Sequence, residues 1–122
     1  FRKVATALIY FGEFEQALNE VKRAMRLDPF SHDLLHGTEA LCHYWLEHYE
    51  ESLSCFKKIK VLKTQLFYMA MAYKKLNNSS LAQEKLKEAR TITGMEIDSF
   101  IKSEPYKDQE LSSQVEDMLK SI

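Results

Sequence analysis

The chain has 122 residues, of which 45% are hydrophobic, with only three glycines and two prolines. Its 17 Lys and Arg nearly balance its 18 Asp and Glu, so the net charge of −1 creates no global field toward nucleic acid or anionic lipid. This composition excludes a disordered chain and offers too few turn residues for a many-stranded sandwich, so we expect an all-α protein with one folded unit.

Apolar run lengths, the two cysteines and the first residues of the chain indicate its expected cellular location. Its longest apolar runs, such as residues 5–10 and 66–73, are far shorter than the ~20 residues of a membrane-spanning helix. Cys42 and Cys55 lie inside helical patterns and are expected to be small buried residues in a reducing, cytoplasmic setting. The chain starts at Phe1 with neither an initiator Met nor a secretory pattern, and we therefore expect a piece of a larger protein.

The first predicted unit covers about residues 1–31. A helix near the start is followed by a turn at Gly12 and by a second helix that ends at Asp28-Pro29. Apolar residues of the second helix recur at the i, i+3, i+4 and i+7 spacing of one helical face. They are Phe14, Ala17, Leu18, Val21, Ala24 and Met25.

The second predicted unit covers about residues 32–63. Tyr49, Ser52 and Phe56 repeat the offsets of the first unit. This alignment leaves His36 and Glu39 where apolar residues belong, although Ala40 fits a small position. The register of the first helix in this unit stays open.

The third predicted unit covers about residues 64–93 and ends at Gly94. Its first helix carries one apolar face and ends in Lys74-Lys75, where cations favour the helix dipole. The small residues Ala17, Ser52 and Ala82 are 35 and 30 positions apart and bracket a period of about 34 residues. The repeated units therefore form an array over residues 1–93.

Residues 94–122 form a predicted helical extension that caps this array. A short helix with Phe100 ends before Pro105, and Asp108 is placed to cap a second helix. The second helix has one apolar stripe and is expected to pack across the last pair. The stripe consists of Leu111, Val115, Met118, Leu119 and Ile122.

These units resemble the tetratricopeptide repeat, a pair of helices with small and aromatic residues at fixed positions. The first unit carries the resemblance in Ala5, Leu8, Gly12, Phe14, Ala17, Val21, Ala24 and Pro29, and the third in Leu66, Met69, Ala70, Tyr73, Ala82, Leu86 and Ala89. The resemblance implies an α-solenoid of about three helix pairs, with a concave groove lined by the first helix of each pair.

The groove residues that the resemblance implies are aromatic and apolar with a basic edge, chemistry suited to a protein or peptide segment. They are Arg2, Thr6, Ile9, Tyr10, Leu41, Tyr44, Trp45, Phe67, Tyr68, Met71, Lys74 and Lys75. The alternative is that several of these rings belong to the core or lie under the C-terminal helix. The Lys, Asn and Arg clamp by which some family members hold a C-terminal carboxylate is absent from the matching positions.

The tail carries a narrower resemblance. A short helix followed by Glu104-Pro105-Tyr106-Lys107-Asp108 and an amphipathic helix is similar to the C-terminal region of some bacterial class III adenylate/guanylate cyclases and related multidomain regulators. This implies a regulatory fragment of a signalling protein, and it does not make the fragment an enzyme, because the chain has no cyclase motif.

Other site chemistry finds little support in the sequence. His36, His43 and His48 fall at i, i+7 and i+12, which is poor spacing for one metal ion, so we expect no metal or cofactor. No phosphate loop or nucleophile motif occurs, so we expect no catalytic residues. The basic run 57–63 is expected to be a solvated helix face, and neither nucleic acid nor membrane is an expected partner.

The sequence therefore predicts a scaffold or protein-interaction module. The alternative function is a homo-oligomerisation element, with a homodimer formed through exposed repeat ends.

Overall fold

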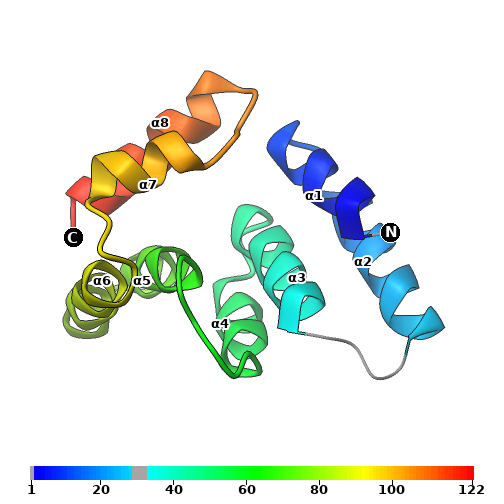
Figure 1. Cartoon of the computed structure of the whole chain (residues 1–122), viewed down its shortest axis with the longest axis horizontal. Coiled ribbons are helices and arrows are strands. Elements are labelled where there is room, and N and C mark those ends of the chain that lie inside the picture. Colours follow the sequence, from blue (N-terminus) through cyan, green and yellow to red (C-terminus); the bar gives the residue numbers. More distant parts are fainter. Residues whose placement is uncertain (1, 29–32) are drawn as a thin grey trace. The chain divides into compact units, whose positions relative to one another are not determined.

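The computed structural model describes residues 2–28 and 33–122, apart from the side chains of Arg2, Lys3 and Asp33. The described residues are all-α, as predicted, and contain no strand. The described residues form eight helices, which are labelled in Figure 1. They are α1 (Arg2–Tyr10), α2 (Phe14–Leu27), α3 (Asp33–Trp45), α4 (Tyr49–Lys57), α5 (Gln65–Lys75), α6 (Ser79–Thr93), α7 (Ile97–Ser103) and α8 (Gln109–Lys120). None of these helices is long and apolar enough to cross a membrane.

The chain divides into two compact units, residues 1–61 and 62–122. In the first unit α1 packs on α2, α3 packs on α4, and both α1 and α2 contact α3. In the second unit α5 packs on α6, α7 packs on α8, and α8 also contacts α5. The predicted division at residue 93 falls between α6 and α7, inside the second unit. The predicted Pro29 stop lies outside the described residues.

One backbone turn recurs in the first three helix pairs. Gly12, Glu47 and Asn77 have left-handed φ values of 85°, 67° and 61°. The amide of the next residue then reaches back to the first helix, from Glu13 N to Leu8 O at 2.8 Å in the first pair. The matching bonds run from His48 to His43 and from Asn78 to Tyr73, at 2.8 and 2.9 Å. The three pairs are therefore joined by the same local geometry.

The same positions relative to each turn are also buried. On the first helix of each pair, seven residues before the turn, lies an alanine with 0% exposure, and these are Ala5, Ala40 and Ala70. On the second helix, five residues after the turn, lies another fully buried small residue, and these are Ala17, Ser52 and Ala82. Small side chains at both positions allow the helix backbones to approach closely. In the second pair the Ser52 hydroxyl also donates to the Ala40 carbonyl at 2.7 Å.

These matching positions settle the helix register that the sequence left open. Ala40 of α3 takes the place of Ala5 in α1 and of Ala70 in α5, with no shift along the helix. His36 and Glu39 consequently do stand at positions where the other pairs carry apolar residues. Among the described side chains, the buried Nδ1 of His36 has no hydrogen-bond partner. Helix α3 therefore carries two polar side chains at positions that are apolar in the first helices of the other pairs.

The C-terminal helices form where the sequence predicts them. The Asp108 side chain accepts a hydrogen bond from the Glu110 amide at 2.9 Å and caps α8. The side chains of Leu111, Val115 and Leu119 on α8 are buried. The contact between α8 and α5 agrees with the expected packing of this helix on the third pair.

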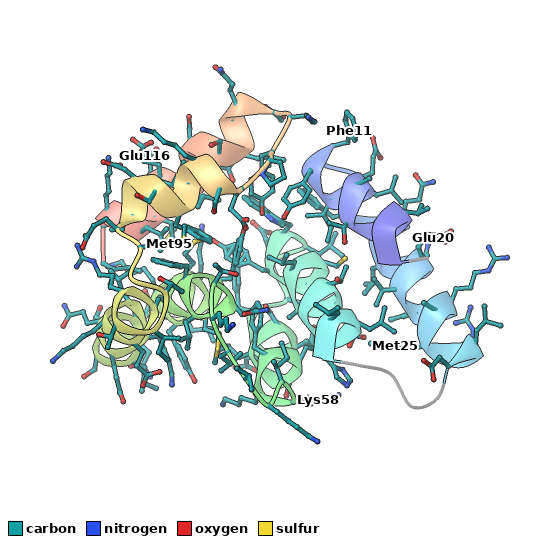
Figure 2. All side chains as sticks on the ribbon, in the orientation of Figure 1. Phe11, Glu20, Met25, Lys58, Met95 and Glu116 are labelled. Carbon is teal, nitrogen blue, oxygen red and sulfur yellow. The ribbon has the colours of Figure 1, made fainter. Side chains whose placement is uncertain are left out.

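The basic run 57–63 differs from the prediction. Helix α4 ends at Lys57, so Lys58, Lys60 and Lys63 lie in the connection to α5. These side chains are exposed, as expected, and Figure 2 shows Lys58 extending away from the ribbon. The run was expected to form one helix face. Only Lys57 lies in a helix, because α4 ends there, and Ile59 two residues later is buried.

Candidate functional site

Four of the predicted groove residues form a half-buried face in the first unit. Thr6 and Tyr10 lie one turn apart on α1, and Leu41 and Trp45 lie one turn apart on α3. Thr6 and Leu41 stand at the same position relative to their turns, as do Tyr10 and Trp45. We call these four residues the α1–α3 face. The contact between α1 and α3 places both halves of this face in one compact unit.

Two other predicted residues of the first unit do not line this face. Ile9 is 1% exposed and Tyr44 is 4% exposed, so both belong to the core. Burial raises the pKa of the Tyr44 phenol well above its usual value. Their burial agrees with the alternative that some of the predicted groove residues belong to the core, and a contact of either residue with a partner stays a prediction. The side chain of Arg2 lies outside the described residues.

Aromatic contacts hold Trp45 in place. Its ring stacks on Phe14 with centroids 5.4 Å apart and planes 7° apart. Tyr44 meets Trp45 edge-on at 5.3 Å and meets Tyr49 edge-on at 5.6 Å. Because aromatic rings lose little conformational freedom when they bind, a supported tryptophan is well suited to contact a partner.

In the second unit three of the five predicted groove residues are covered by the chain itself. Phe67, Tyr68 and Met71 on α5 are 0%, 3% and 0% exposed. Phe100 of α7 stacks on Phe67 with centroids 4.2 Å apart and meets Tyr68 edge-on at 5.5 Å. These three side chains do not line an open groove, which agrees with the alternative that the C-terminal helices cover them. Whether they ever contact a partner stays a prediction.

Hydrogen bonds of Tyr68 also join α5 to the segment after α7. The Tyr68 hydroxyl hydrogen-bonds to the Glu104 carboxylate and lies 2.7 Å from the Tyr106 hydroxyl. Burial raises the pKa of Glu104, whereas the hydrogen bond from Tyr68 acts in the opposite direction. Lys74 is half-buried and Lys75 is exposed in the last turn of α5, as the sequence predicts.

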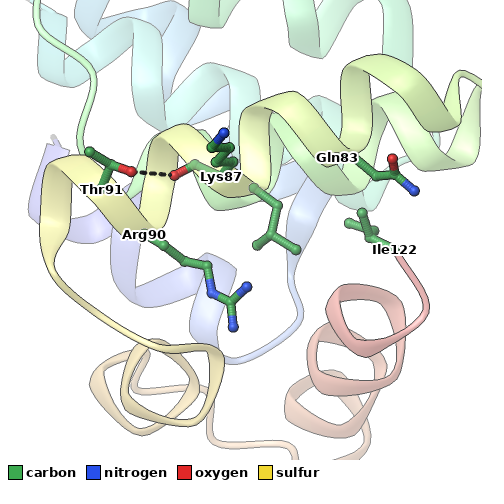
Figure 3. Close-up of a pocket in the computed structure, with 6 residues that line it drawn as sticks. Gln83, Lys87, Arg90, Thr91 and Ile122 are labelled. Carbon is green, nitrogen blue, oxygen red and sulfur yellow. Dashed lines mark hydrogen bonds between the residues drawn. The ribbon is translucent and has the colours of Figure 1, made fainter.

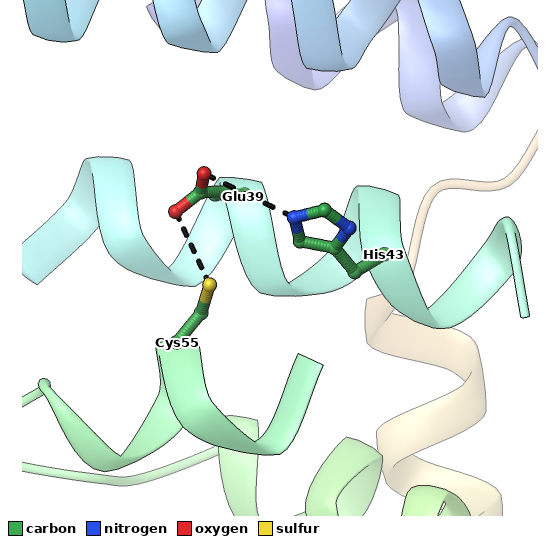
Figure 4. A group of neighbouring side chains, drawn as sticks. All are labelled: Glu39, His43 and Cys55. Carbon is green, nitrogen blue, oxygen red and sulfur yellow. Dashed lines mark hydrogen bonds and ion pairs between the residues drawn. The ribbon is translucent and has the colours of Figure 1, made fainter. Parts of the chain in front are cut away.

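A polar cluster that the sequence reasoning missed lies between α3 and α4. Figure 4 shows Glu39 and His43 on α3 facing Cys55 on α4. The Cys55 thiol donates to Glu39 Oε1 at 3.1 Å, and His43 Nε2 lies 3.9 Å from Glu39 Oε2. Burial, with the Glu39 carboxylate, raises the pKa of the Cys55 thiol to about 12. The other cysteine, Cys42, is also buried and free.

His43 connects this cluster to a second group. Its Nδ1 lies 3.2 Å from Nδ1 of His48, and His48 Nδ1 lies 3.6 Å from Glu51 Oε2. Burial lowers the pKa of His43, so its ring favours the neutral form. The helical spacing of the histidines concealed this contact, because His48 lies beyond the end of α3, where the chain turns back toward His43.

A pocket of about 300 Å³ lies in the second unit beside α6. Figure 3 shows its lining, which consists of Gln83, Leu86, Lys87, Arg90, Thr91 and Ile122. The Arg90 guanidinium is already paired with Glu96 at 2.6 Å. We assign no role to this pocket, because its polar groups do not converge on one point.

Comparison with known proteins adds no further guide. No family model, curated protein or solved structure matches this chain.

Proposed function

We propose that this chain is a tetratricopeptide-like helical-repeat module that binds a segment of another protein on its α1–α3 face. The observation that carries the proposal is the half-buried row of Tyr10, Leu41 and Trp45, held at matching positions of two helix pairs. The recurring turn and the buried small residues beneath it support a repeat architecture.

The chemistry of this face defines the partner. Two aromatic rings and a leucine favour a segment that inserts apolar side chains, either extended or as an amphipathic helix. The cover over α5 restricts the proposed site to the first unit. The likeness of the tail to cyclases and related regulators stays a prediction, and it would make this module part of a signalling protein.

Selection from a displayed random-peptide library, using the whole chain as bait, tests the proposal. We expect peptides with spaced aromatic or aliphatic residues that bind with micromolar affinity in fluorescence anisotropy. The substitution Leu41→Glu should weaken this binding at least about tenfold, since it buries a charge in an apolar contact. Leu27→Glu is the matched control, because Leu27 is 65% exposed on α2, and it should change affinity less than about twofold.

Two results would count against the proposal. One is a selection that yields no peptide sensitive to Leu41→Glu while circular dichroism shows that the variant is folded. The other is a concentration-dependent dimer in light scattering that Leu41→Glu converts to a monomer, which would favour the oligomerisation alternative.

A further inference from the structure

The second helix pair departs from the other two where its helices face each other. Counted from the left-handed residue of each turn, Glu39 stands where the other pairs have Val4 and Met69. His43 likewise stands where they have Leu8 and Tyr73. Polar side chains that are largely buried need polar partners, and Glu39 has both Cys55 and His43 beside it. The neighbouring pairs show that the fold itself does not require polar side chains at these positions.

The three facing groups are ligands of one class of metal ion. Thiolate, imidazole and carboxylate together suit zinc, whereas Mg²⁺ and Ca²⁺ prefer oxygen ligands alone. Glu39 and His43 lie one turn apart on α3, and Cys55 reaches them from α4. The packing of α3 on α4 thus brings all three side chains to one place.

The three side chains are close enough to reach one zinc ion after small side-chain rotations. One ligand atom from each of Glu39, His43 and Cys55 lies within 4.8 Å of the other two. Zinc bond lengths at tetrahedral angles place ligand atoms about 3.4 to 3.6 Å apart. In the structure each oxygen of the Glu39 carboxylate faces one of the other two groups, Oε1 at 3.1 Å from Cys55 Sγ and Oε2 at 3.9 Å from His43 Nε2.

We propose that Glu39, His43 and Cys55 bind one Zn²⁺ ion, independently of the protein-binding function proposed above. Three protein ligands leave a fourth coordination position for water or another small ligand. Loss of the Cys55 proton accompanies binding, because the thiolate is the form that coordinates zinc.

His48 supports this assignment from outside the ligand set. When Nε2 of His43 coordinates the metal, its Nδ1 carries the proton and can donate to His48 Nδ1, 3.2 Å away. The bond fixes the orientation of the His43 ring. His48 is therefore a positioning residue, and its loss should weaken zinc binding by about 10- to 100-fold without removing it.

Titration of the whole chain with Co²⁺, prepared without a histidine tag, tests the site. Tetrahedral Co²⁺ gives visible absorption, and a cobalt–thiolate bond adds a charge-transfer band in the near ultraviolet. We expect one Co²⁺ per chain, complete displacement by Zn²⁺ and none by Mg²⁺. The substitution Cys55→Ser should remove the charge-transfer band and weaken zinc binding by more than about 100-fold. Cys42→Ser is the matched control, because Cys42 is the other buried free cysteine, and it should leave both unchanged.

Two further variants separate metal binding from folding. Glu39→Val and His43→Leu place the first pair's own residues in the second pair, so they should fold and yet lose zinc binding. Zinc should raise the melting temperature of the natural chain and leave that of these variants unchanged. The proposal is overturned if no one-to-one complex forms, or if Cys42→Ser removes the charge-transfer band. It is also overturned if His48→Gln abolishes binding that Cys55→Ser retains, since the ion would then lie at His43, His48 and Glu51.

Discussion

Phe100→Ala removes the side chain that joins α7 to α5. The ring is 0% exposed and contacts both Phe67 and Tyr68. Truncation leaves a cavity and breaks two aromatic contacts in one step. Buried Phe→Ala substitutions cost about 3–5 kcal/mol, and each aromatic contact contributes about 0.5–1.5 kcal/mol within that total. With two partners, we expect a loss near the upper end, about 4–5 kcal/mol.

Urea unfolding followed by far-ultraviolet circular dichroism measures this loss, and amide hydrogen exchange locates it. Protection should fall first in α7, because this helix loses the aromatic contacts of Phe100 with Phe67 and Tyr68 on α5. Phe11→Ala is the matched control. Phe11 directly follows α1, where Figure 2 labels it, and its side chain is 63% exposed, so its loss should cost less than about 0.5 kcal/mol. A cost below about 1 kcal/mol for Phe100→Ala, with α7 still protected, would refute the packing of α7 on α5.

Substitutions at three further positions test the packing at Ser52, the turn at Glu47 and the titration of Glu104. Ser52→Leu should cost about 1–3 kcal/mol in urea unfolding by overfilling the contact with Ala40, whereas Ser52→Ala should cost no more than about 1.5 kcal/mol. Glu47→Gly should leave the melting temperature unchanged or raise it, because glycine adopts the positive φ of this turn without strain, and a clear decrease would contradict the assigned turn. Burial raises the pKa of Glu104, so the folded chain holds this proton more tightly than the unfolded chain. The resulting stability is present below the unfolded pKa of about 4.3 and is lost as pH rises through the folded pKa. Glu104→Gln keeps an acceptor for Tyr68. It should flatten the dependence of the unfolding free energy on pH over that window. An unchanged slope would contradict the assignment.

Local sequence patterns determined most of the helices and turns. The spacing of apolar residues predicted the helix pairs, and Asp108 marked the start of α8, because periodicity and capping depend on residues a few positions apart. The small residues Ala17, Ser52 and Ala82 were identified from their spacing and are all fully buried. A first helix shifted in the second pair was an open alternative, and the matching turn at Glu47 removes it.

The exposed and covered faces were decided by tertiary structure. Residues 66–73 are all buried, although the sequence assigned one side of α5 to an open groove. Their uninterrupted apolar run was the available signal, since a helix that is apolar all round is covered on every side. The run could not show that the cover is Phe100 of α7, because that contact joins residues more than thirty positions apart.

The cluster of Glu39, His43 and Cys55 shows the same difference between local sequence pattern and tertiary contact. The sequence revealed that Glu39 occupies an apolar position, yet it treated the histidines only by their spacing along one helix. Cys55 meets Glu39 and His43 because α4 folds back on α3, and His48 meets His43 because the turn reverses the chain. Helical periodicity is a local property that one segment determines alone, whereas a ligand set drawn from two helices exists only after they have packed together.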